Sequence, residues 1–362
     1  MDHDGRQNRL RLEITNDDVN FLLVTHLPNI RYLCGFTGSS AALLVSDRGS
    51  ILFTDGRYRT QALEEVAAAK VVIGPKSPAL AAAEWLSTRY KSSTPAFLAL
   101  EPESISAGMR NRVVAALKGK LRLRSLPPVI ERARMVKDTS EILCIRKAVK
   151  LGADLFNTAR KRIRPGTTEV EVAAAMEYEA RIAGAEGMSF PTILASGKRS
   201  AIVHGRASAA RVPRRGFVVC DFGVILAGYC SDRTRTVHVG PPSKEARQLY
   251  ESVLEAQSAA ISAVRPGVTC AEVDGAARSV LKKRKLDRYF THSTGHGLGL
   301  EIHEAPRLAV GQVQKLQTGM VVTIEPGVYI PGKYGVRIED VVVVTSSGCE
   351  VLTPDDKDLV VI

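Results

Sequence analysis

The sequence lacks any apolar run of about 18 residues, the length that a membrane-spanning helix needs. Its first residues are polar and no apolar segment follows them, which predicts that the chain carries no signal peptide. Low-complexity tracts and long proline-rich stretches are also missing. We therefore expect a globular protein with no membrane partner.

Closely spaced cysteine pairs are absent too. The cysteines are Cys34, Cys144, Cys220, Cys230, Cys270 and Cys349. None of them forms a C-x-x-C pair, and a chain of 362 residues can fold without disulfide bonds. The sequence therefore predicts ordinary thiols and a location in the reducing cytoplasm.

The net charge of +12 raises the question of an acidic partner such as nucleic acid. The basic residues are, however, spread along the chain, and the densest cluster spans only residues 282–285. This cluster follows an apparent helix, whose C-terminus favours positive charge. We therefore expect a solvated helix end and no nucleic-acid partner.

The length suits two domains of roughly 100–200 residues each. The β-rich runs and helical patterns of the first part lie at residues 21–24, 41–45, 51–53, 58–68 and 78–90. They predict an α/β domain over residues 1–132. A second domain, residues 133–362, begins with Asp138-Thr139-Ser140-Glu141, which has the spacing of a helix capping box.

The second domain contains a repeated phrase. Ile163-Arg164-Pro165-Gly166-Thr167-Thr168 and Val264-Arg265-Pro266-Gly267-Val268-Thr269 are separated by 101 residues, since 266 − 165 = 101. Helical patterns flank both phrases, at residues 140–162, 168–183, 243–263 and 269–285. The matching context predicts two similar halves around a shared site. The alternative is that the phrase is only a common turn between helices.

Two aspartates lie in β-rich runs of the first half. A hairpin with its turn at Leu226-Ala227 sets Asp221 opposite Asp232, because both pairs of numbers add up to 453. Opposed side chains have Cβ atoms about 4.5–5.5 Å apart, and two carboxylates so close repel unless a cation or proton lies between them. The alternative is that either aspartate pairs with Arg233 or Arg235.

Two glutamates repeat this arrangement in the second half. A hairpin centred on Gly332 sets Glu325 opposite Glu339, because both sums are 664. Charged side chains rarely occupy apolar strands unless they are paired or bind a metal. We therefore expect these two acids to face each other as well.

Two further segments carry histidines. His292, His296 and His303 fall within twelve residues, among glycines that permit close backbone approach. His303-Glu304 does not begin an H-E-x-x-H zinc motif, because position 307 is Arg307. The segment 197–205, which contains His204, superficially suggests a phosphate-binding loop, but it lacks the required glycine and hydroxyl residues.

Four acids and one histidine together predict a site for two divalent metal ions. Carboxylate-rich sites suit manganese, cobalt, iron or zinc, and an imidazole ligand disfavours calcium and magnesium. Each of these residues taken alone has an ordinary structural explanation. Their combination among glycine-rich turns is what favours the metal site.

The ordered set of candidate ligands resembles that of the pita-bread metallopeptidases, which include proline aminopeptidase, prolidase and methionine aminopeptidase. The set is Asp221, Asp232, His296, Glu325 and Glu339. Segments 29–40 and 54–58 resemble the N-terminal domain of the proline-specific members, which methionine aminopeptidases lack. Creatinase shares the architecture without the metal ligands, whereas this chain keeps all five.

The resemblance covers essentially the whole chain and implies a fold. The N-terminal domain should be the creatinase/prolidase type, an α/β domain that is ribonuclease H-like. The C-terminal domain should be an α+β pita-bread domain with an internal pseudo-twofold duplication. The resemblance also implies a homodimer.

The resemblance assigns metal-binding roles to the five ligands. Asp221 should chelate one ion, and His296 with Glu325 the other, while Asp232 and Glu339 should bridge them. Two ions, most simply manganese, are expected, with cobalt, iron or zinc as alternatives. A hydroxide shared by the ions should then be the nucleophile.

Catalytic and substrate-binding roles follow in the same way. Glu325 should carry a proton to the leaving proline nitrogen. His204 and His303 should hold the scissile carbonyl and stabilise the oxyanion, and His292 should line the pocket on the proline side. Arg337 should orient a ligating carboxylate.

The predicted reaction is hydrolysis of the Xaa-Pro bond at the N-terminus of dipeptides or short peptides. Arg307 resembles the arginine that binds the substrate carboxylate in some prolidases; the alternative is a surface arginine paired with an acid. Val203 and Lys198-Arg199 depart from the family pattern and put the pocket shape in question. Alternative functions are an aminopeptidase without proline preference and a catalytically silent peptide-binding module.

Overall fold

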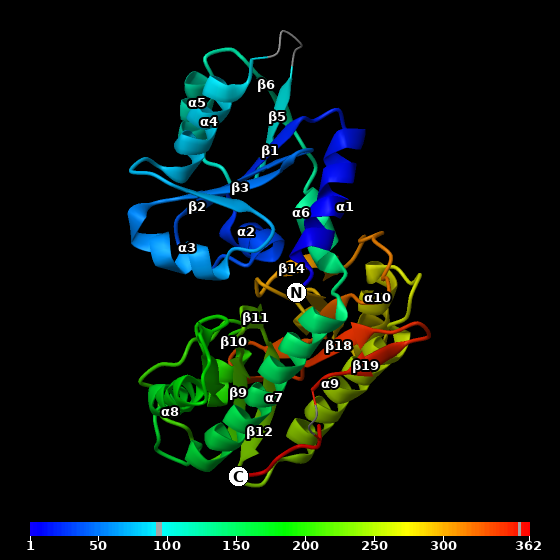
Figure 1. Cartoon of the computed structure of the whole chain (residues 1–362). Coiled ribbons are helices and arrows are strands. Elements are labelled where there is room, and N and C mark those ends of the chain that lie inside the picture. The colour runs from blue at the N-terminus through cyan, green and yellow to red at the C-terminus, as the bar shows by residue number, and fades with distance from the viewer. Residues whose placement is uncertain (92–95, 354–355) are drawn as a thin grey trace. The chain divides into compact units, whose positions relative to one another are not determined.

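The computed structural model describes residues 1–91, 96–353 and 356–362. It divides into two compact units, Met1–Arg134 and Met135–Ile362. Each unit is described by itself (Figure 1). No helix of the described residues combines the length and the apolar character needed to cross a lipid bilayer.

The first unit is built on a six-stranded sheet with the strand order β4-β3-β2-β1-β5-β6. Its strands are β1 (Phe21–Val24), β2 (Ala41–Ser46), β3 (Gly49–Thr54), β4 (Lys70–Ile73), β5 (Phe97–Leu100) and β6 (Arg122–Ser125). Strands β1, β2 and β3 are antiparallel neighbours, whereas β4, β5 and β6 each join in parallel. The edge strands carry exposed charged residues such as Lys70 and Arg122, which discourage pairing with another sheet.

Helices cover this sheet. They are α1 (His3–Asn16), α2 (Leu27–Cys34), α3 (Arg59–Glu65), α4 (Pro78–Arg89), α5 (Ala107–Leu117) and α6 (Val129–Met135), with a 3₁₀ turn η1 (Gly56–Tyr58). Alanine and leucine side chains of α4 pack with Leu23 and Phe53 of the central strands in one core. The predicted strands 21–24, 41–45 and 51–53 are all present, and the predicted helices at 58–68 and 78–90 correspond to α3 and α4.

The second unit contains four long helices and thirteen short strands among the described residues. The helices are α7 (Thr139–Arg162), α8 (Glu169–Ile182), α9 (Lys244–Ala263) and α10 (Cys270–Lys283), with 3₁₀ turns η2 (Gly197–Ala201) and η3 (Asp287–Tyr289). The strands of the first half are β7 (Gly187–Met188), β8 (Ile193–Ser196), β9 (Gly216–Phe222), β10 (Val224–Leu226), β11 (Tyr229–Cys230) and β12 (Arg233–Val239). Those of the second half are β13 (Gly295–Gly297), β14 (Glu304–Leu308), β15 (Val321–Ile324), β16 (Gly327–Ile330), β17 (Tyr334–Arg337), β18 (Asp340–Val344) and β19 (Cys349–Val351).

The repeated phrase joins two similar helix pairs, as the sequence predicts. It connects α7 to α8 and α9 to α10, and its glycines, Gly166 and Gly267, adopt φ values of 89° and 85°. These values favour glycine, because other residues are strained there. Capping boxes begin α7, α8 and α10, including the predicted one from Asp138 to Glu141.

Each helix pair packs on its own sheet. Helices α7 and α8 bury apolar side chains against the sheet β12-β9-β8, and α9 and α10 bury theirs against β15–β18. Figure 1 shows α8 and α9 on opposite sides of this unit with strands between them. The basic cluster 282–285 lies exposed at the end of α10, as expected for a helix C-terminus.

Candidate metal centre and substrate cavity

The hairpin that carries Asp221 and Asp232 differs from the predicted one by one residue at the turn. Ile225 pairs with Cys230, so the turn is Ala227-Gly228, where φ is 50° and 81°. The residue opposite Asp221 is therefore Thr234, and the prediction that the two aspartates are cross-strand partners is wrong. Two successive left-handed residues form the tight turn that matches the twist of a hairpin, and this decides the register.

The aspartates nevertheless approach each other, because this register sets Asp232 opposite Gly223, two residues from Asp221 on the same face of the hairpin. Asp221 lies near the end of β9, and Asp232 lies in the break between β11 and β12. The break occurs at Gly223, where a Cβ atom would overlap the carbonyl group of Ser231. The close approach of the two backbones at this glycine brings the two carboxylates to the same place.

The second hairpin has the predicted register. Ile324 pairs with Asp340 and Gly327 with Arg337, so all pairs add up to 664. Glu325 and Glu339 occupy the interruption between the pair β15–β18 and the pair β16–β17. The backbone N–H of Glu339 donates to the carbonyl group of Thr234 on β12, which brings this hairpin against the first one.

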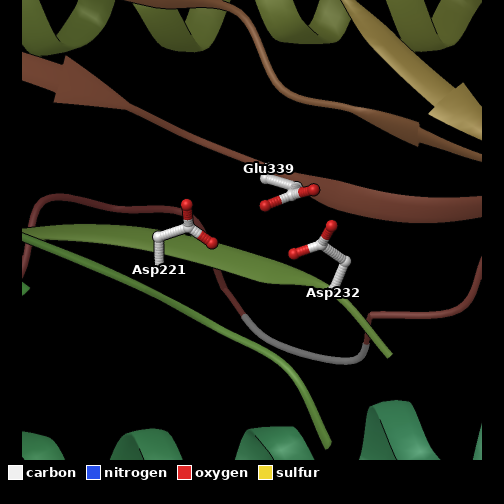
Figure 2. Close-up of side chains that lie close together, drawn as sticks. All are labelled: Asp221, Asp232 and Glu339. Carbon is white, nitrogen blue, oxygen red and sulfur yellow. The ribbon is translucent and has the colours of Figure 1, made fainter. Parts of the chain in front are cut away.

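Three of the acids form a compact cluster. Asp221, Asp232 and Glu339 are buried, and each offers a carboxylate oxygen within 4.8 Å of the others (Figure 2). The Oε1 atom of Glu339 is buried and has no hydrogen-bond partner among the described residues. An acceptor in this position is costly to bury unless a proton or cation lies beside it.

His296 faces this cluster with a lone pair. Its Nδ1 lies 2.9 Å from the carbonyl oxygen of Gly297, which can only accept, so Nδ1 carries the hydrogen. Burial lowers the pKa of His296 to about 4, so the ring is neutral and Nε2 is unprotonated. This Nε2 lies 3.5 Å from a carboxylate oxygen of Asp232 and 3.5 Å from one of Glu325. One imidazole nitrogen and two carboxylate oxygens directed at one space suit a metal cation.

The acids hold protons unusually well. Burial, followed by repulsion from Glu339 and Asp221, raises the pKa of Asp232 well above its usual range. Burial also raises the pKa of Glu339, with further repulsion from Glu325 and Asp221. Burial raises the pKa of Glu325 to about 8. The donor set therefore fits divalent cations, whose charge would replace the protons that these carboxyl groups otherwise require.

Arg337 is the one cation in direct contact with the carboxylate cluster among the described residues. It is buried, and its guanidinium group donates to Asp221 at 2.5 Å, to the Tyr329 hydroxyl at 2.6 Å and to the Thr234 hydroxyl at 3.0 Å. Thr234 in turn donates to Glu339 at 2.8 Å. Arg337 thereby orients the carboxylate of Asp221 directly and that of Glu339 through Thr234. Asp221 therefore pairs with Arg337 and not with Arg233 or Arg235, the alternative partners considered from the sequence.

The hydrogen bonds of His292 define which atoms carry protons. Its Nδ1 donates to the carbonyl group of Ser293 at 2.8 Å. Burial, helped by the charge of Arg337, lowers the pKa of His292 to about 4, so the ring is neutral. Its Nε2 therefore accepts from the hydroxyl group of Tyr329 at 3.0 Å. Both ring nitrogens are engaged within the protein, so His292 can offer a ligand only the surface of its ring.

All ten predicted site residues line one cavity of about 580 Å³ in the second unit. They are His204, Asp221, Asp232, His292, His296, His303, Arg307, Glu325, Arg337 and Glu339. His303 packs edge-on against His296, with 4.4 Å between ring centroids, and burial lowers its pKa. Val203 also lines the cavity, whereas Lys198 and Arg199 are not among its described lining residues.

Other lining residues were not predicted from the sequence. Phe190, Pro191 and Ile193 provide apolar walls, and Arg206 and Glu304 provide charges. The apolar residues carry no distinguishing signal in a sequence rich in such residues. Tyr329 could have been found, because the correct register of its hairpin places it on the same face as Arg337.

Comparison with known protein families follows the same division of the chain. Residues 143–346 match the model of metallopeptidase family M24, and residues 6–136 match the creatinase/prolidase N-terminal domain. The chain belongs to metallopeptidase family M24. The predicted two-domain fold class is thereby confirmed.

Solved and curated members of the M24 family are similar over much of the chain. The Xaa-Pro dipeptidase from Bacillus anthracis has a TM-score of 0.94 and 36% identity, covering 99% of this chain and 100% of the other. The X-Pro aminopeptidase from Thermotoga maritima has a TM-score of 0.90 and 35% identity, covering 98% and 99%. The Xaa-Pro dipeptidase of Pyrococcus furiosus is 45% identical over 236 residues, which are 65% of this chain and 68% of that protein.

Removing one acid of the cluster should weaken metal binding. We expect Asp232→Asn and Glu339→Gln to bind manganese about a hundredfold more weakly, because each loses a charged ligand. Metal analysis after equilibration with Mn²⁺ and gel filtration measures this. The matched control is Glu251→Gln, an exposed acid on α9. Undiminished metal content in both cluster variants would contradict the assignment of the cluster as a metal site.

The raised pKa values predict how pH affects the metal-free protein. The pKa of Glu325 rises from an ordinary 4.5 to about 8, so between these values the folded protein holds a proton that the unfolded chain does not. Raising the pH in this range therefore favours unfolding. His292 and His296, whose pKa values are lowered to about 4, have the opposite effect on stability. They act only below their ordinary pKa of 6.5, where the unfolded chain binds protons that the folded protein does not.

We accordingly expect the Tm of chelator-treated protein to fall between pH 6.5 and 8, the window between those ordinary and shifted values. Glu325→Gln should flatten the fall, and saturating Mn²⁺ should remove most of it. Differential scanning calorimetry at several pH values in this window makes the comparison. A Tm that stays constant or rises with pH in the chelated wild type would show that these carboxyl groups do not hold their protons.

Proposed function

We propose that this chain is a metal-dependent exopeptidase that hydrolyses the bond between an N-terminal residue and a following proline. Membership of the M24 family and relatives named Xaa-Pro dipeptidase support this function. The observation that carries it is a single cavity in which a cluster of buried acids and a neutral His296 lies beside His204, His303 and Arg307. The proposal also includes two metal ions per subunit and manganese as the metal.

In this proposal the five ligands divide between two ions. Asp221 would hold one ion, His296 and Glu325 would hold the other, and Asp232 and Glu339 would contribute to both. The lone pair of His296 and the unpartnered oxygen of Glu339 support these positions. When bound, the ions supply Lewis-acid activation of the scissile carbonyl and lower the pKa of water.

The protein side chains supply the remaining chemistry. Glu325 moves a proton to the proline nitrogen that leaves, a general acid–base role that its place in the cavity wall allows. Burial lowers the pKa of His303, so its ring is neutral and can donate one N–H to the developing oxyanion. His204 lines the same cavity and can donate a second hydrogen bond.

The proline side of the substrate would meet the ring of His292. Because both nitrogens of His292 are engaged by Ser293 and Tyr329, this ring provides apolar contact rather than a hydrogen bond. A proline side chain has no hydrogen-bonding group, so such a surface suits it. Arg337 holds Tyr329 and Asp221 and thereby connects the proline-side wall to the metal ligands.

Arg307 supports the dipeptidase form of the function. It lies on β14, lines the cavity, and forms no ion pair with any described residue. An unpaired guanidinium group at this position can bind the free carboxylate of an Xaa-Pro dipeptide. Solved relatives of similar likeness are named dipeptidase and aminopeptidase, so substrate length needs its own experiment. A cytoplasmic location and a homodimer stay predictions of the sequence.

Three peptides distinguish the proposed substrates. We expect the Mn²⁺-loaded protein to cleave Ala-Pro, to cleave Ala-Pro-Ala more slowly, and to leave Ala-Ala-Ala intact, with a chelator abolishing all turnover. Release of free amino acids measured by chromatography gives the rates. Exclusive cleavage of Ala-Pro-Ala would change the assignment to an aminopeptidase. Cleavage of Ala-Ala-Ala alone, or of no peptide, would contradict the proline assignment.

Arg307→Ala tests the carboxylate contact. We expect KM for Ala-Pro to rise by roughly tenfold to a hundredfold, because a charge-assisted pair is lost, with a smaller change in kcat. Ala-Pro-amide, which has no carboxylate, should be cleaved equally by both proteins. Arg247→Ala, an exposed arginine on α9, serves as the control. An equal loss for the acid and the amide would remove the carboxylate role.

A further inference from the structure

Glu169 is a buried acid that the reaction does not use. It lies in the first turn of α8, is 0% exposed and accepts five distinct donor groups. The N–H and the hydroxyl group of Ser196 donate to it at 2.8 and 3.0 Å, and those of Ser208 donate at 3.1 and 2.7 Å. The fifth donor is Nε of Arg199, at 3.1 Å. One carboxylate therefore ties together both ends of the segment 196–208.

This segment carries His204 into the cavity. The His204 ring makes no hydrogen bond to any described residue, so the position of the ring depends on the backbone that holds it. Arg199 strengthens that backbone, because its Nη2 donates to the carbonyl group of Arg206 at 2.9 Å. Arg199 thus connects the Glu169 carboxylate to a point two residues beyond His204.

Helix α8 does not need Glu169 in order to begin. Its capping box is made by Thr168 and Glu171, and the repeated half has the same box at the start of α10. The position equivalent to Glu169 in that half is Cys270, since 169 + 101 = 270. The buried acid is therefore specific to the half whose loop carries His204.

A related arrangement holds the other histidine segment. Asp274 of α10 is 0% exposed and accepts the N–H and hydroxyl groups of Thr294 at 3.1 and 2.8 Å. Its ion-pair partner, Arg278, donates to the carbonyl group of His292 at 2.6 Å. In both halves a buried acid with an arginine partner anchors a histidine-bearing segment, although the acids occupy different positions of the repeat.

We propose that Glu169, together with Arg199, is a positioning residue that holds the segment 196–208 so that His204 faces the scissile carbonyl. This inference rests on the function proposed above. A glutamine in place of Glu169 would keep the size but would remove the charge that Arg199 pairs with. It would also turn an N–H₂ group toward donors that need an acceptor, so part of the anchor would be lost.

The kinetic test is a double-mutant cycle with the Mn²⁺-loaded full chain and Ala-Pro. We expect Glu169→Gln to lower kcat/KM by about tenfold to a hundredfold in the wild type, since small displacements of a positioned group are costly. In the His204→Ala background the same substitution should cost less than about twofold. An equal loss in both backgrounds would overturn the proposal, because Glu169 would then act through some other group.

Matched variants separate positioning from folding. Glu171→Gln changes the neighbouring exposed acid of the same helix turn, and we expect it to lower Tm slightly and to leave kcat/KM unchanged. If Glu169→Gln does not fold, Arg199→Met takes its place in the double-mutant cycle, because the Arg199 side chain is 34% exposed and its replacement disturbs the core less. Arg199→Lys, which keeps the charge, should recover part of the loss that Arg199→Met causes.

Hydrogen–deuterium exchange tests whether Glu169 anchors the segment 196–208, and it does not require an active enzyme. We expect Glu169→Gln to speed amide exchange in residues 196–208, where one of the Ser196 and Ser208 N–H groups loses its acceptor, and to leave residues 290–304 unchanged. If the wild type cleaves no Xaa-Pro peptide, the proposed function is wrong, but the exchange rates still test whether Glu169 anchors the segment. Unchanged exchange in residues 196–208 would overturn the anchoring role.

Discussion

The mutual repulsion of buried carboxylates is the interaction on which the rest of this site depends. Asp221, Asp232 and Glu339 offer oxygens within 4.8 Å of one another, and Arg337 is the one described residue that brings a positive charge into direct contact with them. Burial makes each negative charge costly, and the neighbouring acids add to that cost. Divalent cations remove both costs at once, and the neutral lone pair of His296 completes a donor set that suits them.

The duplicated architecture explains how such a cluster can be assembled. Each half supplies a helix pair that supports a sheet, and each half contributes two acids from an interrupted hairpin. The observed registers place Asp221 and Asp232 on one face of the first hairpin and set Glu325 opposite Glu339 in the second, so each hairpin presents its two acids on one side. At Gly223 in one hairpin and between Ile324 and Gly327 in the other, the chain leaves the ladder and turns its acids toward a common point.

The rigidity of the cavity walls follows from hydrogen bonds made outside the reacting groups. Tyr329, Thr234 and Arg337 link His292 to the carboxylates of Asp221 and Glu339 through buried, hydrogen-bonded side chains. Glu304, next to His303, forms an ion pair with Lys137 at 3.1 Å. The His204 segment has Glu169 instead. A preorganised site of this kind requires that the supporting groups be as well ordered as the groups that react.

Much of the site could be read from the sequence, and the exceptions have physical reasons. The register of the second hairpin was predicted because its turn is centred on a glycine and its apolar residues alternate clearly. The first hairpin was misplaced by one residue at the turn, because the left-handed conformation of Ala227 is not suggested by its side chain. The same error concealed Thr234. Glu169 and Asp274 could not be assigned, since their roles depend on segments that lie far away in the sequence.

The most direct test of the central claim is calorimetric titration of the chelated protein with Mn²⁺ at about pH 7, repeated in buffers of different ionisation enthalpy. If buried carboxyl groups hold protons that metal ions replace, binding should be stoichiometric, and the heat should vary with the buffer because roughly one or more protons are released per chain. Absence of stoichiometric binding, or binding with no dependence on the buffer, would contradict the account of the site as a carboxylate cluster that requires metal.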